Sequence, residues 1–321
     1  MEYYKNKKIF IAGGSGLVGT NLLIRLIKFN KNTKASYNSK IQNKKLKKYY
    51  RKYDFKNFND CIKATKNMNI VFIVAVKAAG IIGIKKNFED NISENFLIRS
   101  NLLKSCIKNN VKKVLWVSSS TIYQATRSKI SENKLDLNKD PYDIYLGTGW
   151  LYRYLEKLCF FYNQKKNIDI KIIRTTSIYG PYDNFNEKKS HVIPALIKKV
   201  LNSKNILEVW GDKKIIRDFV YVDDLVDAIL KLTKKNKINE PLNFSSAKAT
   251  SIASLANKIL KTSKILQFKK KKIIYKYPYR SSANYRVLDN SKINKFLKNL
   301  SRTKLEIGLK KTIQWYNNTK Q

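Results

Sequence analysis

Short apolar runs alternate with longer amphipathic segments through the first half of the chain. Continuous apolar runs bounded by polar residues predict buried strands, here at Lys8–Ala12, Lys34–Tyr37, Ile70–Val76, Lys113–Ser118 and Ile168–Arg174. Segments whose apolar residues recur three and four positions apart predict helices, here at Gly19–Phe29, Asp60–Lys66, Asn91–Asn109 and Tyr142–Gln164. The alternation predicts right-handed crossovers and an α/β fold, a doubly wound parallel sheet of the Rossmann kind.

The pattern loosens in the second half, where a smaller lobe is expected. Its elements are a strand at Ile206–Trp210 and helices at Ile193–Leu201, Val222–Lys234 and Ser251–Leu260. We therefore expect a dinucleotide-binding Rossmann domain over residues 1–178 and a substrate-binding lobe over 179–321. Segments near 206–230 and 241–246 are expected to return to the first domain.

A glycine-rich loop lies directly between the first strand and the first helix. Gly13, Gly16 and Gly19 are spaced three apart, a pattern that permits a tight turn and a close approach of the backbone to a pyrophosphate. The helix that follows presents free N–H groups and the positive end of its dipole to the same anion. The expected cofactor-binding residues of this loop are Gly13, Gly14, Ser15, Gly16, Leu17, Val18 and Gly19.

The residues after the second strand bear on the choice of cofactor. A carboxylate at this point ordinarily binds the adenosine ribose of NAD, but the sequence reads Ser36-Tyr-Asn-Ser39-Lys40. Polar and cationic groups suit a 2′-phosphate, so NADP is favoured over NAD, with Ser39 at the ribose. Asp54 and Phe55 resemble the adenine-contacting acidic and apolar pair of the short-chain dehydrogenase/reductase superfamily, although a helix-capping role explains Asp54 equally well. Ala75 is expected beside the cofactor.

The composition adds a strong positive charge. Lys and Arg number 66 against 23 Asp and Glu, a net charge of +43. Lysines lie on nearly every expected helix, which favours a general coding bias over a nucleic-acid site, although Lys44–Lys56 and Lys269–Arg280 mix cations with aromatic residues and keep that alternative open. Such a field attracts anionic ligands, including nucleotides.

The remaining composition argues for a soluble cytoplasmic protein. Three scattered cysteines, Cys61, Cys106 and Cys159, have no metal-ligand spacing and indicate a reducing compartment. The longest apolar run, Ile70–Ile84, is too short and too interrupted for a membrane span. No metal or membrane partner is therefore expected, and a nucleic-acid partner stays the less favoured alternative.

Several later motifs resemble one enzyme family over nearly the whole chain. They are Ala78-Ala-Gly-Ile-Ile-Gly83 with Asn95, Val117-Ser-Ser-Ser-Thr-Ile-Tyr123, Tyr179-Gly-Pro-Tyr-Asp-Asn-Phe185, Ser190-His-Val-Ile-Pro-Ala195, Val209-Trp-Gly-Asp212 and Arg217-Asp-Phe-Val-Tyr-Val-Asp-Asp224. The sequence is similar to the extended short-chain dehydrogenases/reductases, in particular to the NAD-dependent epimerase/dehydratase family and its GDP-L-fucose synthase-like members.

The resemblance implies an NAD(P)-dependent nucleotide-sugar reductase or epimerase that acts at sugar C4 on a substrate of the GDP-4-keto-6-deoxymannose class. Ser119 matches the active-site serine, and Tyr142 or Tyr145 matches the proton-transferring tyrosine. A lysine normally follows this tyrosine by four residues and lowers the pKa of the phenol from about 10. The corresponding residues are Leu146 and Gly149, so the lysine is missing in either register. Arg153 and Lys157 lie too far along the helix to replace it.

Further site residues are implied by the same resemblance. His191, the only histidine, matches an acid used in epimerisation, but Thr121 stands where the family has its partner cysteine, which puts epimerisation in doubt. Arg217 matches an arginine that binds the diphosphate of the nucleotide sugar. The other implied substrate contacts are Asn184, Trp210 and Arg286, and the family resemblance also implies a homodimer.

Two other functions remain open at this point. A nucleotide-sugar 4-epimerase or dehydratase with tightly held NAD would have the same fold. A non-catalytic homologue that binds a nucleotide or RNA would account for the missing lysine and for the positive charge.

Overall fold

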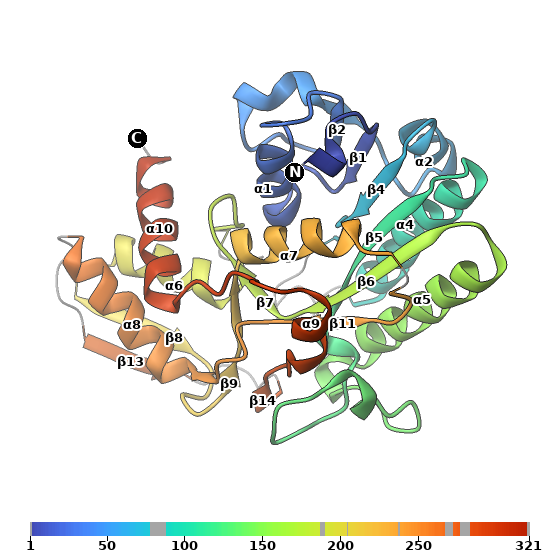
Figure 1. Cartoon of the computed structure of the whole chain (residues 1–321). Coiled ribbons are helices and arrows are strands. Elements are labelled where there is room, and N and C mark those ends of the chain that lie inside the picture. Colours follow the sequence, from blue (N-terminus) through green and yellow to red (C-terminus); the bar gives the residue numbers. More distant parts are fainter. Residues whose placement is uncertain are drawn as a thin grey trace.

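The chain forms a central parallel sheet with helices on both faces and a smaller lobe beside it (Figure 1). In this computed structural model the described residues are 2–77, 88–186, 190–203, 205–236, 238–266, 272–276 and 283–319. The seven-stranded sheet has the order β11-β6-β5-β4-β1-β2-β3, and every pairing in it is parallel. This is the predicted Rossmann arrangement, and its strand order reverses between β1 and β4, where such folds bind their ligands.

The strands of the central sheet are short. They are β1 (Ile9–Ala12), β2 (Thr33–Tyr37), β3 (Tyr50–Lys52), β4 (Ile70–Ile73), β5 (Lys113–Ser119), β6 (Asp169–Thr175) and β11 (Leu242–Phe244). The helices beside them are α1 (Leu17–Leu26), α2 (Phe58–Thr65), α4 (Phe88–Lys108), α5 (Leu146–Lys165), α7 (Val222–Lys234) and α9 (Ser291–Phe296).

Alternate side chains of each strand enter two separate cores, because successive residues point to opposite faces of a sheet. Ile9 and Ile11 of β1 pack with α1, α7 and α9, whereas Phe10 and Ala12 pack with α2, α4 and α5. Both faces of the sheet are covered, which is why the strands read as continuous apolar runs. The three cysteines are buried, free thiols of α2, α4 and α5.

The smaller lobe has its own core. It is built from α6 (Val192–Asn202), β8 (Ile206–Trp210), β10 (Phe219–Tyr221), α8 (Ile252–Ile265), β13 (Lys272–Lys276) and α10 (Leu305–Asn318). The short strands β7 (Ser177–Tyr179), β9 (Ile216–Arg217), β12 (Thr250–Ser251) and β14 (Tyr285–Arg286) join this lobe to the central sheet region. Among the described residues, no helix combines the length and apolar character that crossing a membrane requires.

One prediction about the elements is wrong in a way that matters for function. The helix expected from Tyr142 begins at Leu146, because residues Asp143–Tyr145 form a single 3-10 turn closed by the Tyr145 N–H on the Tyr142 carbonyl (2.6 Å). Tyr142 and Tyr145 therefore lie on the approach to α5 and not within it. The expected strand Ile70–Val76 also ends earlier, at Ile73.

A buried ion pair fastens α5 to the sheet. Glu156 of α5 is 3% exposed and receives three hydrogen bonds from the guanidinium of Arg174 on β6, the shortest 2.7 Å long. Ser118 of β5 donates to the same carboxylate (2.5 Å). Arg174 also donates to the hydroxyl of Tyr123, which donates in turn to Asn243 of β11. A single network therefore connects α5 with β5, β6 and β11.

We expect Glu156→Gln to destabilise the protein by about 3–5 kcal/mol, because it leaves the buried charge of Arg174 without a counterion. The matched control is Glu306→Gln, which breaks the exposed pair with Lys258 and should cost at most about 1 kcal/mol. Urea unfolding of the two variants measures both changes. Equal, small losses would show that the buried pair does not fasten α5.

Candidate active site

The glycine loop approaches neighbouring backbone too closely for side chains. A Cβ on Gly13 would lie 2.6 Å from the Ala75 backbone, and one on Gly19 would lie 2.1 Å from the Gly13 carbonyl oxygen. Gly13 also has a φ of +89°, which disfavours other residues. The loop is held by hydrogen bonds from Gly13 N–H to the Ser36 hydroxyl (2.8 Å) and from the Tyr50 hydroxyl to the Gly14 carbonyl (3.0 Å).

This loop delivers an uncapped helix start to the carboxyl end of β1. Gly16 is the N-cap of α1 and supplies no side-chain acceptor, so the first N–H groups of the helix, around Leu17 and Val18, are available to an anion. Among the described residues, a Cβ on Gly16 would meet one atom within 4 Å, the Gly13 carbonyl oxygen at 3.5 Å. The described part of the chain therefore leaves space beside Gly16, and contact of Ser15 and Gly16 with a pyrophosphate stays a prediction.

The residues expected to contact the ribose and adenine of the cofactor differ in their exposure and in their contacts. Ser39 and Lys40 are exposed beyond the end of β2, and Ala75 is buried against Gly13. Asp54 accepts a hydrogen bond from the Lys56 N–H (3.1 Å) in the turn before α2, whereas the N-cap of the helix is Asn57. Phe55 is buried, with its ring edge against Phe10. Its side chain therefore serves the core, and contact of this pair with adenine stays a prediction.

Ser119, at the end of β5, is oriented by Thr121. Its hydroxyl oxygen accepts hydrogen bonds from the Thr121 N–H (3.2 Å) and from the Thr121 hydroxyl (3.0 Å). Because its oxygen accepts both, the Ser119 proton is left to donate elsewhere. Thr121 is thus occupied with Ser119, which agrees with the expectation that it does not serve as a base toward carbon.

Tyr142 and Tyr145 face the same small cavity, of about 20 Å³, as Thr121 and Arg286. The two possible registers differ in the space that a lysine would find. In the Tyr145 register the missing lysine would stand at Gly149, where even a Cβ would lie 2.5 Å from Pro141 and 2.6 Å from the Thr121 carbonyl. In the Tyr142 register it would stand at Leu146, which is 42% exposed and has room for a longer side chain.

Two arginines adjoin the tyrosines. The Arg286 guanidinium lies 5.0 Å from the centre of the Tyr145 ring. Burial lowers the pKa of Arg217 to about 10, with a further contribution from the charge of Arg286, and both tyrosines act on Arg217 in the opposite direction. Arg217 is 5% exposed. The pair forms a strongly cationic site that suits a diphosphate.

His191 lies at the N-terminus of α6 and belongs electrostatically to this group. Desolvation, and then the charge of Arg286, lower its pKa although much of the residue surface is exposed. The acid role of His191 in epimerisation stays a prediction.

The two other implied substrate contacts lie away from the cavity. Asn184 closes a local turn with Asn186 (3.0 Å), and Trp210 is exposed at the end of β8, with Lys199 4.0 Å from its ring centre. The segment Ala78–Gly83 lies outside the described residues. Two cavity-lining residues, Gln124 and Tyr285, were not foreseen, because each merely adjoins a motif residue and carries no spacing signal.

A further unforeseen residue is Asp183. Its carboxyl group is 7% exposed and accepts a hydrogen bond from the Asn184 N–H (2.7 Å), and its Oδ2 atom has no hydrogen-bond partner in the part of the chain that the structure describes. Burial raises the pKa of Asp183 to about 7. In the sequence, Asp183 is distinguished only by its place in the Tyr179–Phe185 motif.

Comparison with known proteins finds relatives that match along most of the chain. The model of the NAD dependent epimerase/dehydratase family matches residues 9–244. The chain is 27% identical over 320 residues to GDP-mannose 3,5-epimerase of Arabidopsis thaliana, covering 97% of this chain and 82% of that protein. It is also 27% identical over 273 residues to GDP-L-fucose synthase of Escherichia coli K12, covering 79% of this chain and 81% of that protein.

Solved structures share the fold. A UDP-glucose 4-epimerase of Thermotoga maritima, solved with UDP-glucose, has a TM-score of 0.85 at 21% identity and covers 98% of this chain and 99% of its own. A GDP-L-fucose synthetase of Naegleria fowleri bound to NADP has a TM-score of 0.82 at 21% identity, covering 98% and 94%.

We expect Gly16→Val to abolish dinucleotide binding while the protein stays folded, because the new side chain meets little protein but fills the space beside the helix start. Gly13→Val should instead unfold the loop as well, because its Cβ would overlap the Ala75 backbone. Calorimetric titration with NADPH and thermal unfolding separate the two effects. NADPH affinity retained in folded Gly16→Val would contradict the assignment of the loop.

Proposed function

The chain belongs to the NAD-dependent epimerase/dehydratase family, and we propose from this premise that it is an NAD(P)-dependent reductase of a 4-keto nucleotide sugar. The substrate class we favour is a GDP-linked 4-keto-6-deoxyhexose, since GDP-sugar enzymes are among the relatives that match along most of the chain. The observation that carries the proposal is the meeting of Thr121, Tyr142 and Arg286 at one cavity, with Thr121 fixing Ser119.

Each residue has a distinct role in the proposed reaction. Bound NAD(P)H supplies the hydride for C4. The Tyr142 hydroxyl gives its proton to the sugar oxygen O4 as the carbonyl becomes an alcohol, and Ser119 donates a hydrogen bond to the same oxygen. The proton of Ser119 is available for this because Thr121 provides both of the hydrogen bonds that its oxygen accepts.

Arg217 and Arg286 are proposed to bind the diphosphate of the substrate. Burial of Arg217 beside a second cation is unfavourable, and its lowered pKa expresses that cost. A diphosphate placed between the two guanidinium groups would relieve the repulsion through charge-assisted hydrogen bonds. Thermal-shift screening with NADPH and with GDP-, UDP-, dTDP- and CDP-sugars tests this proposal. Stabilisation by a GDP-sugar supports it, and a response to none of them would refute it.

A nucleotide-sugar 4-epimerase with tightly held NAD is the second candidate. The likeness in fold to the Thermotoga maritima enzyme favours it, and the same serine and tyrosine could serve that reaction. Epimerisation at C3 or C5 is less well supported, because Thr121 replaces the expected cysteine. Nicotinamide that stays bound through purification would favour the 4-epimerase.

NADP should bind at least as tightly as NAD, because residues Tyr37–Lys40 carry no carboxylate and Lys40 is exposed beside Ser39. Ser39→Asp should reverse this order, since the new carboxylate accepts from the ribose hydroxyl and repels a 2′-phosphate. Isothermal titration with both cofactors measures the ratio. A native protein with a strong preference for NAD would contradict our assignment of this strand end.

Because the lysine is missing, we expect the enzyme to favour ketone reduction over alcohol oxidation at neutral pH. A phenol ordinarily titrates near pH 10, so at pH 7 it gives a proton readily but accepts one poorly. Ketone reduction should therefore be efficient at neutral pH, and alcohol oxidation should be slow there and rise toward alkaline pH. Leu146→Lys should speed the oxidation at pH 7, whereas Leu146→Met serves as the uncharged control.

The measurement is a pH profile of hydride transfer in both directions for the native protein and the two variants. Oxidation that is as fast at pH 7 as at pH 9 in the native protein would show that another cation already tunes the tyrosine.

A further inference from the structure

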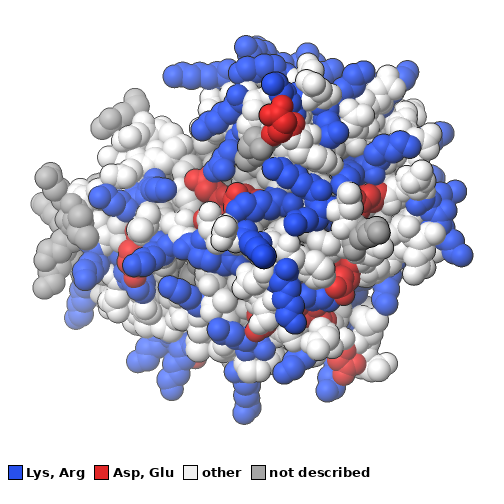
Figure 2. All heavy atoms as spheres, viewed as in Figure 1, with Lys and Arg blue, Asp and Glu red and all other residues white. Residues whose placement is uncertain are grey.

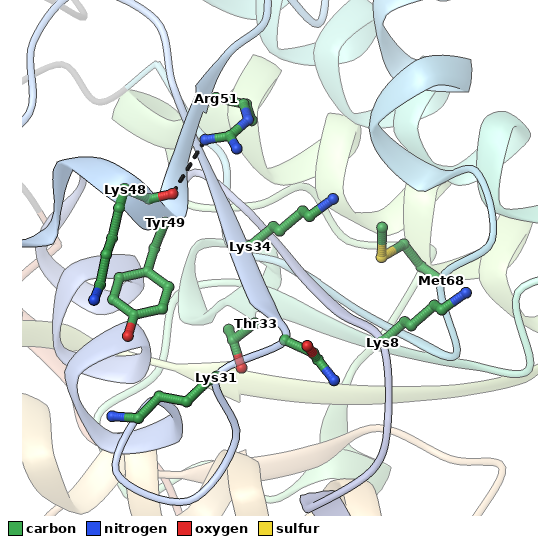
Figure 3. Close-up of a pocket in the computed structure, with 9 residues that line it drawn as sticks. Lys8, Lys31, Thr33, Lys34, Lys48, Tyr49, Arg51 and Met68 are labelled. Carbon is green, nitrogen blue, oxygen red and sulfur yellow. Dashed lines mark hydrogen bonds between the residues drawn. The ribbon is translucent and has the colours of Figure 1, made fainter.

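A cationic groove lies at the opposite end of the sheet from the glycine loop. It has a volume of about 600 Å³ and is lined by Lys8, Lys31, Asn32, Thr33, Lys34, Lys48, Tyr49, Arg51 and Met68. Figure 3 shows Lys48, Tyr49 and Lys31 on one side of the start of β2, with Lys34, Lys8 and Met68 on the other. Five cations and no acidic residue line the groove.

The groove is separate from the proposed active site. Lys8 immediately precedes β1, Lys34 is the second residue of β2, and Arg51 is the middle residue of β3. These strands are parallel, so the groove borders their amino ends. The glycine loop follows the carboxyl end of β1. The cations of the groove therefore have no part in the site described above.

The five cations are exposed and uncompensated. Within the described ranges, none of Lys8, Lys31, Lys34, Lys48 and Arg51 forms a salt bridge with an acidic side chain. The guanidinium group of Arg51 is oriented by neighbouring backbone, because its Nη1 donates to the carbonyls of Lys48 (3.1 Å) and Tyr50 (2.8 Å). These hydrogen bonds hold the guanidinium at the groove before any ligand binds.

The backbone positions of these cations are spread along the groove. Lys8 immediately precedes β1, Lys34 lies on β2 and Arg51 on β3, and neighbouring strands lie about 4.8 Å apart, so the three positions span about 10 Å. A chain of several phosphates can contact all three positions, which favours it over a single phosphate.

The uncharged residues of the groove narrow the choice further. Among the described residues, none of the strongly exposed large apolar side chains lines it, so nothing there would insert into a membrane. Tyr49 is 8% exposed and offers little surface for stacking a base.

We propose that this groove binds the phosphodiester backbone of a single-stranded nucleic acid, without preference for its bases. The stretch Lys44–Lys56, which combines cations with aromatic residues, supplies three of the lining residues: Lys48, Tyr49 and Arg51. The general positive charge of the surface, visible over the whole face in Figure 2, brings the strand to the protein, and the groove holds it.

The test is fluorescence anisotropy of a labelled oligouridylate with the full chain at several salt concentrations. The triple variant Lys8→Gln, Lys34→Gln and Arg51→Gln should bind roughly tenfold or more weakly, and the slope of log K against log salt should fall by about 2, since each phosphate contact on a single strand contributes about 0.7. The matched control is the triple variant Lys261→Gln, Lys304→Gln and Lys310→Gln. It removes three exposed lysines, one on α8, one directly before α10 and one on α10, and lowers the net charge equally. It should change affinity less than about threefold.

Several outcomes would overturn the proposal. These are no binding by the native protein, equal losses in the two triple variants, or displacement of the RNA by excess NADPH, which would place it at the glycine loop. Binding to phosphatidylserine vesicles that depends on the groove, without binding to RNA, would also overturn it in favour of a membrane surface. The groove variant should keep the NADPH affinity of the native protein, so the outcome is independent of the proposed reductase activity.

Discussion

The buried pair of Glu156 and Arg174 is the constraint on which the candidate active site depends. Leu151, Leu155 and Cys159 of α5 pack in the core shared with α2 and α4. The carboxylate of Glu156 can be buried beside them only where Arg174 and Ser118 meet it. Arg153, one turn earlier on α5, donates to the carbonyls of Ile122 (2.8 Å) and Lys139 (2.6 Å). These bonds hold the segment that carries Thr121 and the approach to Tyr142 in a fixed relation. Arg153 is thereby occupied in structure and cannot replace the missing lysine.

A second buried cation, Arg99, connects the glycine loop with the candidate active site. Arg99 of α4 is 1% exposed, donates to the carbonyls of Ala75 (3.0 Å) and Val117 (2.5 Å), and lies 4.2 Å from the ring centre of Trp116. It therefore fixes the ends of β4 and β5 together, and Gly13 packs directly on Ala75. The distance between the glycine loop and Ser119 is therefore set by buried side chains and not by the loop alone.

Local signals made the central sheet and the glycine loop predictable from the sequence. The apolar runs, the three glycines and the helix that follows them each depend on residues that are adjacent in the sequence. Their structure could therefore be predicted from the sequence alone. The short strand β3 was not predicted, because two of its three residues are charged. The strand β11 lies in the segment 241–246 that was expected to return to the first domain, but its pairing with β6 is set by tertiary contacts that the local sequence does not show. The start of α5 was misplaced because the tyrosines continue its apolar period through a 3-10 turn. Arg217 and Arg286 meet only in the folded chain, where the short strands β9 and β14 pair.

The central claim is that this site transfers a hydride to C4 of a nucleotide sugar, with Tyr142 as the proton donor. The most direct measurement uses NADPH deuterated on the nicotinamide C4 and a GDP-linked 4-keto-6-deoxyhexose, with the sugar product analysed by NMR. We expect deuterium at sugar C4 in the native protein, and a loss of at least about a hundredfold in its rate of appearance in Tyr142→Phe, the scale of general acid catalysis. No transfer with any 4-keto nucleotide sugar, or transfer that is unchanged in Tyr142→Phe, would contradict the account.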